Sequence, residues 1–184
     1  MTDTPNWPRI ENHIKNLVDV LHEELDWFSD EELKNSPRRI TDFYHEWWSH
    51  NNFNFTTFER KTDQLVVLKD ITFFSMCSHH MLPFFGKVHI GYLPGGRICG
   101  VSKLARVVRK VASRPQIQEQ MTEEIADLLY GMLKPRGVMV IVHGAHTCMI
   151  GRGVREPNSL MVTSAIRGKF QGNAQLKEEF MRLI

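Results

Sequence analysis

Apolar residues recur at helical spacing near the start of the chain. The positions that share this spacing are Ile10, Ile14, Leu17, Val18 and Leu21. They predict an amphipathic helix that begins at Pro8 and ends near Leu25. The pair Ser29 and Glu32 matches a capping box for a short turn, and Ser36-Pro37 is typical of the N-cap and first residue of a second helix.

The pattern changes after these two predicted helices. Residues 51–62 are polar and aromatic without a period, so we interpret them as a loop that ends an N-terminal helical arm, residues 1–62. We expect residues 63–184 to form the main domain, with a short C-terminal helix. This domain opens with a predicted strand over residues 64–76, which we expect to be bulged or broken at Lys69-Asp70.

A second strand is predicted over residues 83–94, and two helices follow it. Ser102 is expected to cap the first of these helices, and residues 113–116 match a capping box that opens the second. Residues 137–142 are rich in Val, Met and Ile and predict a strand, and residues 159–166 alternate well enough for another. The predicted order after the arm is strand, strand, helix, helix, strand, strand, which is an α+β fold.

Composition narrows the class of protein. The chain has 184 residues, 42% hydrophobic and 24% charged, as in soluble globular proteins. A net charge of +2 without a basic block argues against general nucleic-acid binding. Because no apolar run reaches membrane-spanning length and the N-terminus is polar, we expect no membrane contact and no signal peptide. Three cysteines without a disulfide framework favour a reducing compartment, and we interpret the protein as cytoplasmic.

Cys77, His80 and Cys148 form a candidate metal site. A thiolate and an imidazole lie three residues apart, and a second thiolate follows 68 residues after His80. Catalytic zinc sites hold three protein ligands and keep water in the fourth position, whereas structural sites use four protein ligands. Zinc lowers the pKa of that water toward neutrality, which makes it a nucleophile. Cysteine and histidine are also frequent core residues, so the spacing alone is weak evidence.

A second group of residues is suited to an anionic ligand. The predicted helix start at Ser102 offers free backbone N–H groups, with Lys103 and Arg106 beside it. Arg152, just past Cys148, can add a bidentate contact to a phosphate. The alternative is a solvated basic helix face, which is a common feature of proteins.

The third group of residues is suited to binding a guanine base and to transferring protons. Gln118 and Glu119 place an amide beside a carboxylate, and a carboxylate matches the N1–H and exocyclic amine of guanine. A glutamate in the first helical turn is also favourable for the helix dipole alone. His79 and His146 lie close to the proposed ligands, so they can pass protons to a substrate or serve a structural role.

Several motifs together resemble the GTP cyclohydrolase I family. They are Cys77-Ser78-His79-His80, Gly91-Tyr92-Leu93-Pro94, Ser102-Lys103-Leu104-Ala105-Arg106, Arg114-Pro115-Gln116-Ile117-Gln118-Glu119, His146-Thr147-Cys148-Met149, Arg152-Gly153-Val154 and Thr163-Ser164. The resemblance implies the tunnelling fold, a four-stranded antiparallel sheet with two helices (ββααββ). Copies of this unit join into a ring, commonly a toroidal decamer, with sites between subunits.

The resemblance also implies roles for individual positions. Cys77, His80 and Cys148 match the zinc ligands, and His79 and His146 match the proton-transfer histidines. Gln118 and Glu119 match the guanine-binding positions. The triphosphate-binding positions are matched by Ser102, Lys103, Arg106 and Arg152. The implied reaction opens the imidazole ring of GTP at C8 by zinc-dependent hydrolysis, releases formate and forms 7,8-dihydroneopterin triphosphate.

Two positions depart from the family pattern, because Ser78 and His143 stand where acidic residues are usual. Carboxylates near zinc tune its ligands and its water, so their absence bears on rate and pH optimum. One alternative is therefore a ring-forming homologue that binds GTP without turnover. A third interpretation is a structural zinc module, which needs a fourth protein ligand such as His79 or His146.

Overall fold

The computed structural model describes residues 5–48, 53–59 and 62–184, and the chain divides into two compact units, Met1–His50 and Asn51–Ile184. The first unit contains two helices, α1 (Trp7–Leu25) and α2 (Asp30–Trp48). The predicted first helix is confirmed, and the Asn6 side chain caps it by accepting a hydrogen bond from the Arg9 backbone N–H.

The start predicted for the second helix was wrong. Pro37 lies inside α2, because the helix already begins at Asp30. The Ser29 backbone N–H donates to the Glu32 carboxylate at 2.9 Å, so the capping box opens α2 and does not merely close a short turn. Three acidic residues in the first turn add favourable interactions with the helix dipole.

The second unit is built on a five-stranded sheet. Its long strands are β2 (Val66–Cys77), β3 (Pro83–Leu93), β6 (Gly137–His146) and β7 (Met161–Gly168), and the two-residue strand is β5 (Pro115–Gln116). The sheet order is β5-β2-β3-β6-β7, with antiparallel pairing between the long strands and parallel pairing of β5 on β2. The α+β class is confirmed, but the sheet has one strand more than the predicted four.

The local predictions for this sheet had mixed outcomes. The bulge expected near Lys69-Asp70 is confirmed, because the pairing register shifts between Leu68 and Ile71. The loop interpretation of residues 51–62 was wrong for β1 (Thr57–Glu59), which pairs with β4 (Arg97–Cys99). Residues 51–52 and 60–61 of that prediction lie outside the described residues.

Four helices complete the unit: α3 (Val101–Ala112), α4 (Gln118–Leu133), α5 (Thr147–Ile150) and α6 (Ala174–Leu183). Two predicted caps were wrong. Gly100, not Ser102, is the N-cap of α3, and Ser113 ends α3 instead of opening α4. The segment after Ser113 pairs with β2 as β5, which delays the start of α4 to Gln118.

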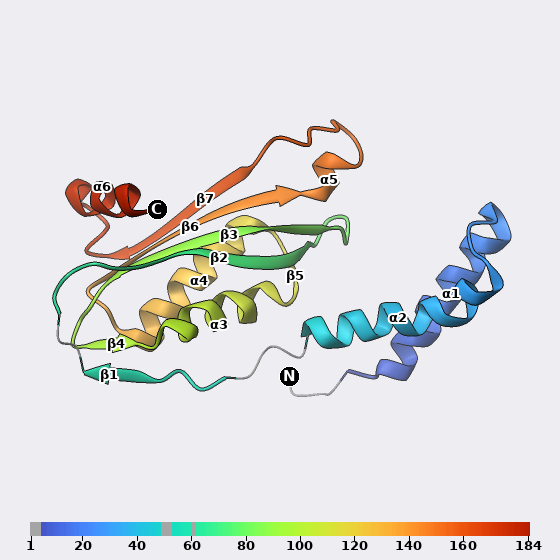
Figure 1. The fold of residues 1–184 in the computed structure, drawn as a ribbon, viewed down its shortest axis with the longest axis horizontal. Helices are drawn as coiled ribbons and strands as arrows, with labels where there is room; N and C mark the ends of the chain where they lie inside the picture. The colour runs from blue at the N-terminus through green and yellow to red at the C-terminus, as the bar shows by residue number, and fades with distance from the viewer. Residues whose placement is uncertain (1–4, 49–52, 60–61) are drawn as a thin grey trace. The chain divides into compact units, whose positions relative to one another are not determined.

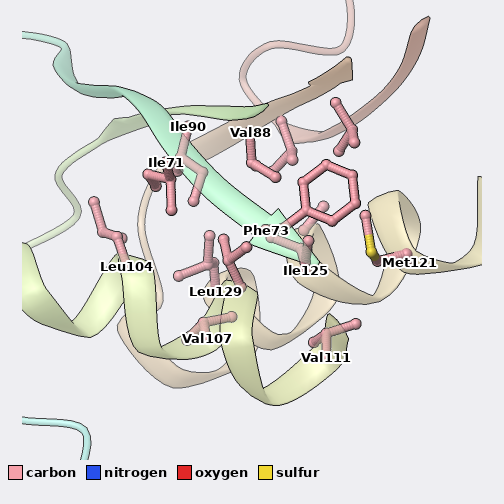
Figure 2. Packing of buried hydrophobic residues seen from close by; sticks show 14 of the residues in the cluster. Ile71, Phe73, Val88, Ile90, Leu104, Val107, Val111, Met121, Ile125 and Leu129 are labelled. Atoms are coloured by element: carbon pink, nitrogen blue, oxygen red, sulfur yellow. The ribbon is translucent and has the colours of Figure 1, made fainter. Parts of the chain in front are cut away.

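The main core lies between α3, α4 and one face of the sheet (Figure 1). In Figure 2, apolar side chains of the two helices point at those of β2 and β3. The labelled core residues are Ile71, Phe73, Val88, Ile90, Leu104, Val107, Val111, Met121, Ile125 and Leu129. A smaller cluster under α6, with Phe180 fully buried, covers part of the opposite face. No helix among the described residues is long and apolar enough to cross a membrane.

Gly86 marks a close approach between β3 and β6. A Cβ at this position would lie 1.9 Å from the His143 backbone oxygen. We expect Gly86→Ala to lower the free energy of unfolding by about 3 kcal/mol, because the two paired strands must separate to admit a methyl group. Urea unfolding measures this change. Gly131→Ala is the control, because its Cβ meets nothing within 4 Å and α4 should gain stability. Equal destabilisation of both variants would contradict the argument.

Candidate metal centre and active site

The metal-binding candidates lie at one end of the sheet. Cys77 is the last residue of β2, His80 lies in the turn that follows, and Cys148 lies in α5 directly after β6. The Cys77 backbone N–H donates to the Leu82 carbonyl at 2.9 Å, which folds the turn back into β3. The Thr147 hydroxyl donates to the Pro83 carbonyl at 2.6 Å and holds α5 against β3. These two hydrogen bonds hold the turn after β2 and the start of α5 against β3.

The three candidate ligand atoms fit a zinc ion. They all lie within 4.8 Å of one another, and Cys77 Sγ lies 3.8 Å from His80 Nδ1. Tetrahedral zinc with ordinary Zn–S and Zn–N bonds needs about 3.6 Å between ligand atoms, so small side-chain rotations suffice. Within residues 5–48, 53–59 and 62–184, no fourth His, Cys or carboxylate joins this group. The geometry therefore matches a three-ligand site better than a closed structural site.

The pKa of Cys148 depends on the charges near its sulfur. Burial raises the pKa of the Cys148 thiol, and the neighbouring Cys77 raises it further. A divalent ion held by the Cys148 sulfur would offset this shift, because it stabilises the thiolate form.

Arg152 contacts one member of this group. Its Nη1 lies 2.7 Å from His80 Nε2, and the Arg152 side chain is otherwise exposed. A guanidinium can only donate, so Nε2 is the accepting nitrogen of His80 in this arrangement. Nδ1, the nitrogen that faces Cys77, then carries the hydrogen. If a metal were held at Nδ1, Nε2 would carry the hydrogen and could no longer accept from Arg152.

His146 is held on the core side of the same site. Its ring stacks on Phe84 with centroids 4.7 Å apart and planes 7° from parallel. Its Nε2 lies 2.9 Å from Gln118 Oε1. Burial lowers the pKa of His146, and the charge of Glu119 opposes this shift. His146 is therefore fixed in orientation and sensitive to a carboxylate at the start of α4.

Gln118 and Glu119 differ sharply in environment. Glu119 is exposed, whereas Gln118 is 1% exposed and both ends of its amide have partners within the chain. The geometry does not support the prediction that the Gln118 amide contacts a base directly. Glu119 remains available to a ligand.

His79 lies on the exposed turn between β2 and β3, beside His80. The centroids of the two imidazole rings are 6.3 Å apart, with the planes nearly perpendicular. His79 and His146 thus stand near the metal group on separate elements. Their predicted proton-transfer roles stay predictions.

Comparison with known proteins shows which family this chain belongs to. A family model described as GTP cyclohydrolase I matches residues 10–184. The chain belongs to the GTP cyclohydrolase I family. GTP cyclohydrolase 1 of Hydrogenobaculum sp. is 44% identical over 173 residues, covering 93% of each chain. That of Aquifex aeolicus is 46% identical over 174 residues, covering 93% of this chain and 95% of its own. That of Wolinella succinogenes is 57% identical over 119 residues, covering 65% and 64%.

Three of the residues that resemble the triphosphate-binding positions of GTP cyclohydrolase I belong to α3 and not to the segments that carry the metal group. Ser102 and Lys103 occupy the first turn of α3, which begins beside β4, and Arg106 lies one turn on. The opposite end of α3 leads into β5 beside Cys77 (Figure 1). The 12 residues of α3 span about 18 Å. One chain therefore does not bring Ser102 and Lys103 to the metal group.

Ser78 and His143, the two departures from the family pattern, lie on different elements of the structure. Ser78 is exposed beside Cys77, and its backbone N–H donates to the Gln116 carbonyl at 3.2 Å. His143 lies on the face of the sheet opposite to His146, because side chains alternate along β6. Its ring lies 5.3 Å from that of His89. Within one chain, His143 therefore does not face the metal group.

Phe84 and Gly144 are site residues that the sequence analysis missed. Phe84 is the register partner of His146 and supports its ring. A Cβ on Gly144 would lie 2.2 Å from Gln118 Oε1. Neither role has a signal in the linear sequence, because both depend on the register of β3 against β6. Only the pairing of the strands reveals them.

Proposed function

We propose that this member of the GTP cyclohydrolase I family opens the imidazole ring of GTP at C8 by zinc-dependent hydrolysis. The products are formate and 7,8-dihydroneopterin triphosphate. The supporting observation is the three-ligand group of Cys77, His80 and Cys148, with His146 fixed beside it. A metal site with an open position next to an oriented imidazole is suited to hydrolysis of an amidine carbon.

The metal and the surrounding side chains divide the chemistry. Zinc held by the three ligands would lower the pKa of a water and supply the nucleophile for C8. Glu119 accepts hydrogen bonds from N1–H and the exocyclic amine of guanine, which orients the base. His79 and His146 supply and remove protons as the ring nitrogens lose C8 and the sugar oxygen changes charge. Arg152 binds phosphate oxygens through its planar guanidinium.

The complete site is proposed to form between copies of the chain in a ring of the tunnelling fold, a toroidal decamer. The support is the position of Ser102, Lys103 and Arg106, which lie toward the opposite end of α3 from the metal group. A neighbouring copy can present these residues and its free helix N-terminus to the triphosphate of a GTP bound here. The three free cysteines agree with a cytoplasmic protein, where thiols stay reduced.

Turnover of GTP tests the proposed function. Purified protein incubated with zinc and GTP should release formate and give a product that becomes fluorescent on oxidation. Treatment with a chelator should stop the reaction, and added zinc should restore it. A zinc-loaded oligomer that binds GTP with saturation but releases no formate would instead support the non-catalytic GTP-binding homologue.

A further inference from the structure

The Gln118 side chain is enclosed between the start of α4 and the edge formed by β6 and β7. It is 1% exposed. Its Nε2 lies 3.2 Å from the Val142 carbonyl oxygen, 2.9 Å from the Met161 carbonyl oxygen and 3.1 Å from Thr163 Oγ1. Two strands therefore supply the partners of one end of this amide.

These partners fix which way the amide points. Backbone carbonyl oxygens only accept hydrogen bonds, so the nitrogen of the Gln118 amide must face Val142 and Met161. The reverse orientation would place the amide oxygen against two other oxygens in a buried space, where unpaired polar atoms are costly. The amide oxygen therefore has to face the other way.

Two threonines reinforce the same direction. The Thr122 hydroxyl donates to the Gln118 backbone carbonyl at 2.8 Å, which uses its only hydrogen. Thr163 Oγ1 lies 2.6 Å from Thr122 Oγ1, so Thr163 donates to Thr122. A lone pair on Thr163 is then left to accept from the Gln118 amide nitrogen. All these hydrogen bonds are consistent with one orientation of Gln118.

The other end of the amide meets His146. Gln118 Oε1 lies 2.9 Å from His146 Nε2, and an amide oxygen can only accept. His146 Nε2 must therefore carry a hydrogen. A neutral imidazole carries one hydrogen, so Nδ1 is the bare nitrogen of that ring.

Phe84 and Gly144 flank the contact between Gln118 and His146. Phe84 stacks on the His146 ring and sets its plane. A side chain on Gly144 would collide with the Gln118 amide oxygen, and its Cβ would also lie 3.5 Å from His146 Nε2. The absence of a side chain at Gly144 therefore permits the contact between Gln118 and His146.

We infer that Gln118 is a positioning residue that holds His146 in the tautomer with the hydrogen on Nε2 and a bare Nδ1. This inference rests on the proposed function, in which His146 transfers protons during GTP hydrolysis. It replaces direct guanine contact as the role of Gln118 and leaves that contact to Glu119. Nδ1 is then the nitrogen that can take a proton from the substrate or from a water.

Solid-state ¹⁵N NMR on histidine-labelled full-length protein tests the tautomer directly. The result does not depend on the number of subunits in the oligomer or on enzymatic activity. The His146 signals are assigned as those lost in His146→Asn. We expect the neutral His146 ring to show a protonated Nε2 and an unprotonated Nδ1. A protonated Nδ1 in the native protein would overturn the inference, even if GTP turnover is normal. Conversely, failure of turnover with the expected tautomer would count against the proposed function alone.

Gln118→Met keeps the side-chain volume and removes both ends of the amide. We expect the His146 signals to shift toward a mixture of tautomers and kcat to fall about 100-fold, with KM changed less than about threefold. A rise in KM at constant kcat would show direct substrate binding and overturn the inference. Gln116→Met is the matched control, because Gln116 is also buried but bonds Val111 and Ser75. It should leave the His146 signals unchanged. If Gln118→Met does not fold, a protonated Nδ1 in the native spectrum still overturns the inference.

Discussion

Cys148→Ala is expected to lower GTP turnover by about 10³-fold or more, because loss of one sulfur ligand removes the metal that activates water. The Cys148 side chain lies at the edge of the core, so the fold should persist with a small change in stability. Zinc content, formate release and thermal unfolding measured on the same sample check the three parts of this prediction.

Cys99→Ala provides the matched control for Cys148→Ala. Cys99 is buried in the core and is not part of the metal group, and burial raises the pKa of its thiol. This variant should keep zinc and turnover. If Cys148→Ala unfolds while Cys99→Ala does not, the metal is structural. If Cys148→Ala keeps both zinc and full turnover, the proposed metal centre is wrong.

Glu119→Gln is expected to lower kcat/KM for GTP about 100-fold, mainly through KM. A carboxylate accepts from two guanine donors, and hydrogen bonds to a charged group contribute about 1.5–3 kcal/mol each. The amide that replaces it turns one acceptor into a donor, which then opposes a guanine N–H. Steady-state kinetics with GTP and with ITP, which lacks the exocyclic amine, measure the effect. The preference for GTP over ITP should shrink in the variant.

Glu123→Gln controls for the loss of a negative charge on α4. Glu123 lies one turn further along this helix and forms an ion pair with Arg167 at 2.5 Å. Arg167 keeps its ion pair with Asp127 when this pair is lost, so stability should change little. Kinetics with GTP should match those of the native protein. Similar losses of kcat/KM in both variants would mean that the total negative charge of α4 affects GTP binding. Glu119 would then make no specific contact with GTP.

The long elements were predictable from the sequence because each has enough residues for its period to show. The first helix, the strands over residues 64–76 and 83–94, and the bulge at Lys69-Asp70 all follow from local patterns. The helix starts were less predictable, because more than one capping signal lies near the start of a helix and only one of them caps it. At residues 113–116, pairing with β2 decided the outcome over the local signal.

The candidate site divides in a similar way. The ligand types of Cys77, His80 and Cys148 are visible in the sequence, and the structure brings their side chains together. The sequence does not show that Gln118 points inward and Glu119 outward. That difference depends on how α4 is rotated against the sheet, which is set by packing with β6 and β7.

The order of the strands has a consequence for how the metal centre is assembled. Cys77 ends β2 and Cys148 lies just after β6, and these two strands are both paired with β3 but not with each other. A chain that has formed only the hairpin of β2 and β3 offers two ligands, and the third arrives when a long intervening segment closes. A metal bound by all three residues would therefore require β2, β3 and β6 to be in their native arrangement.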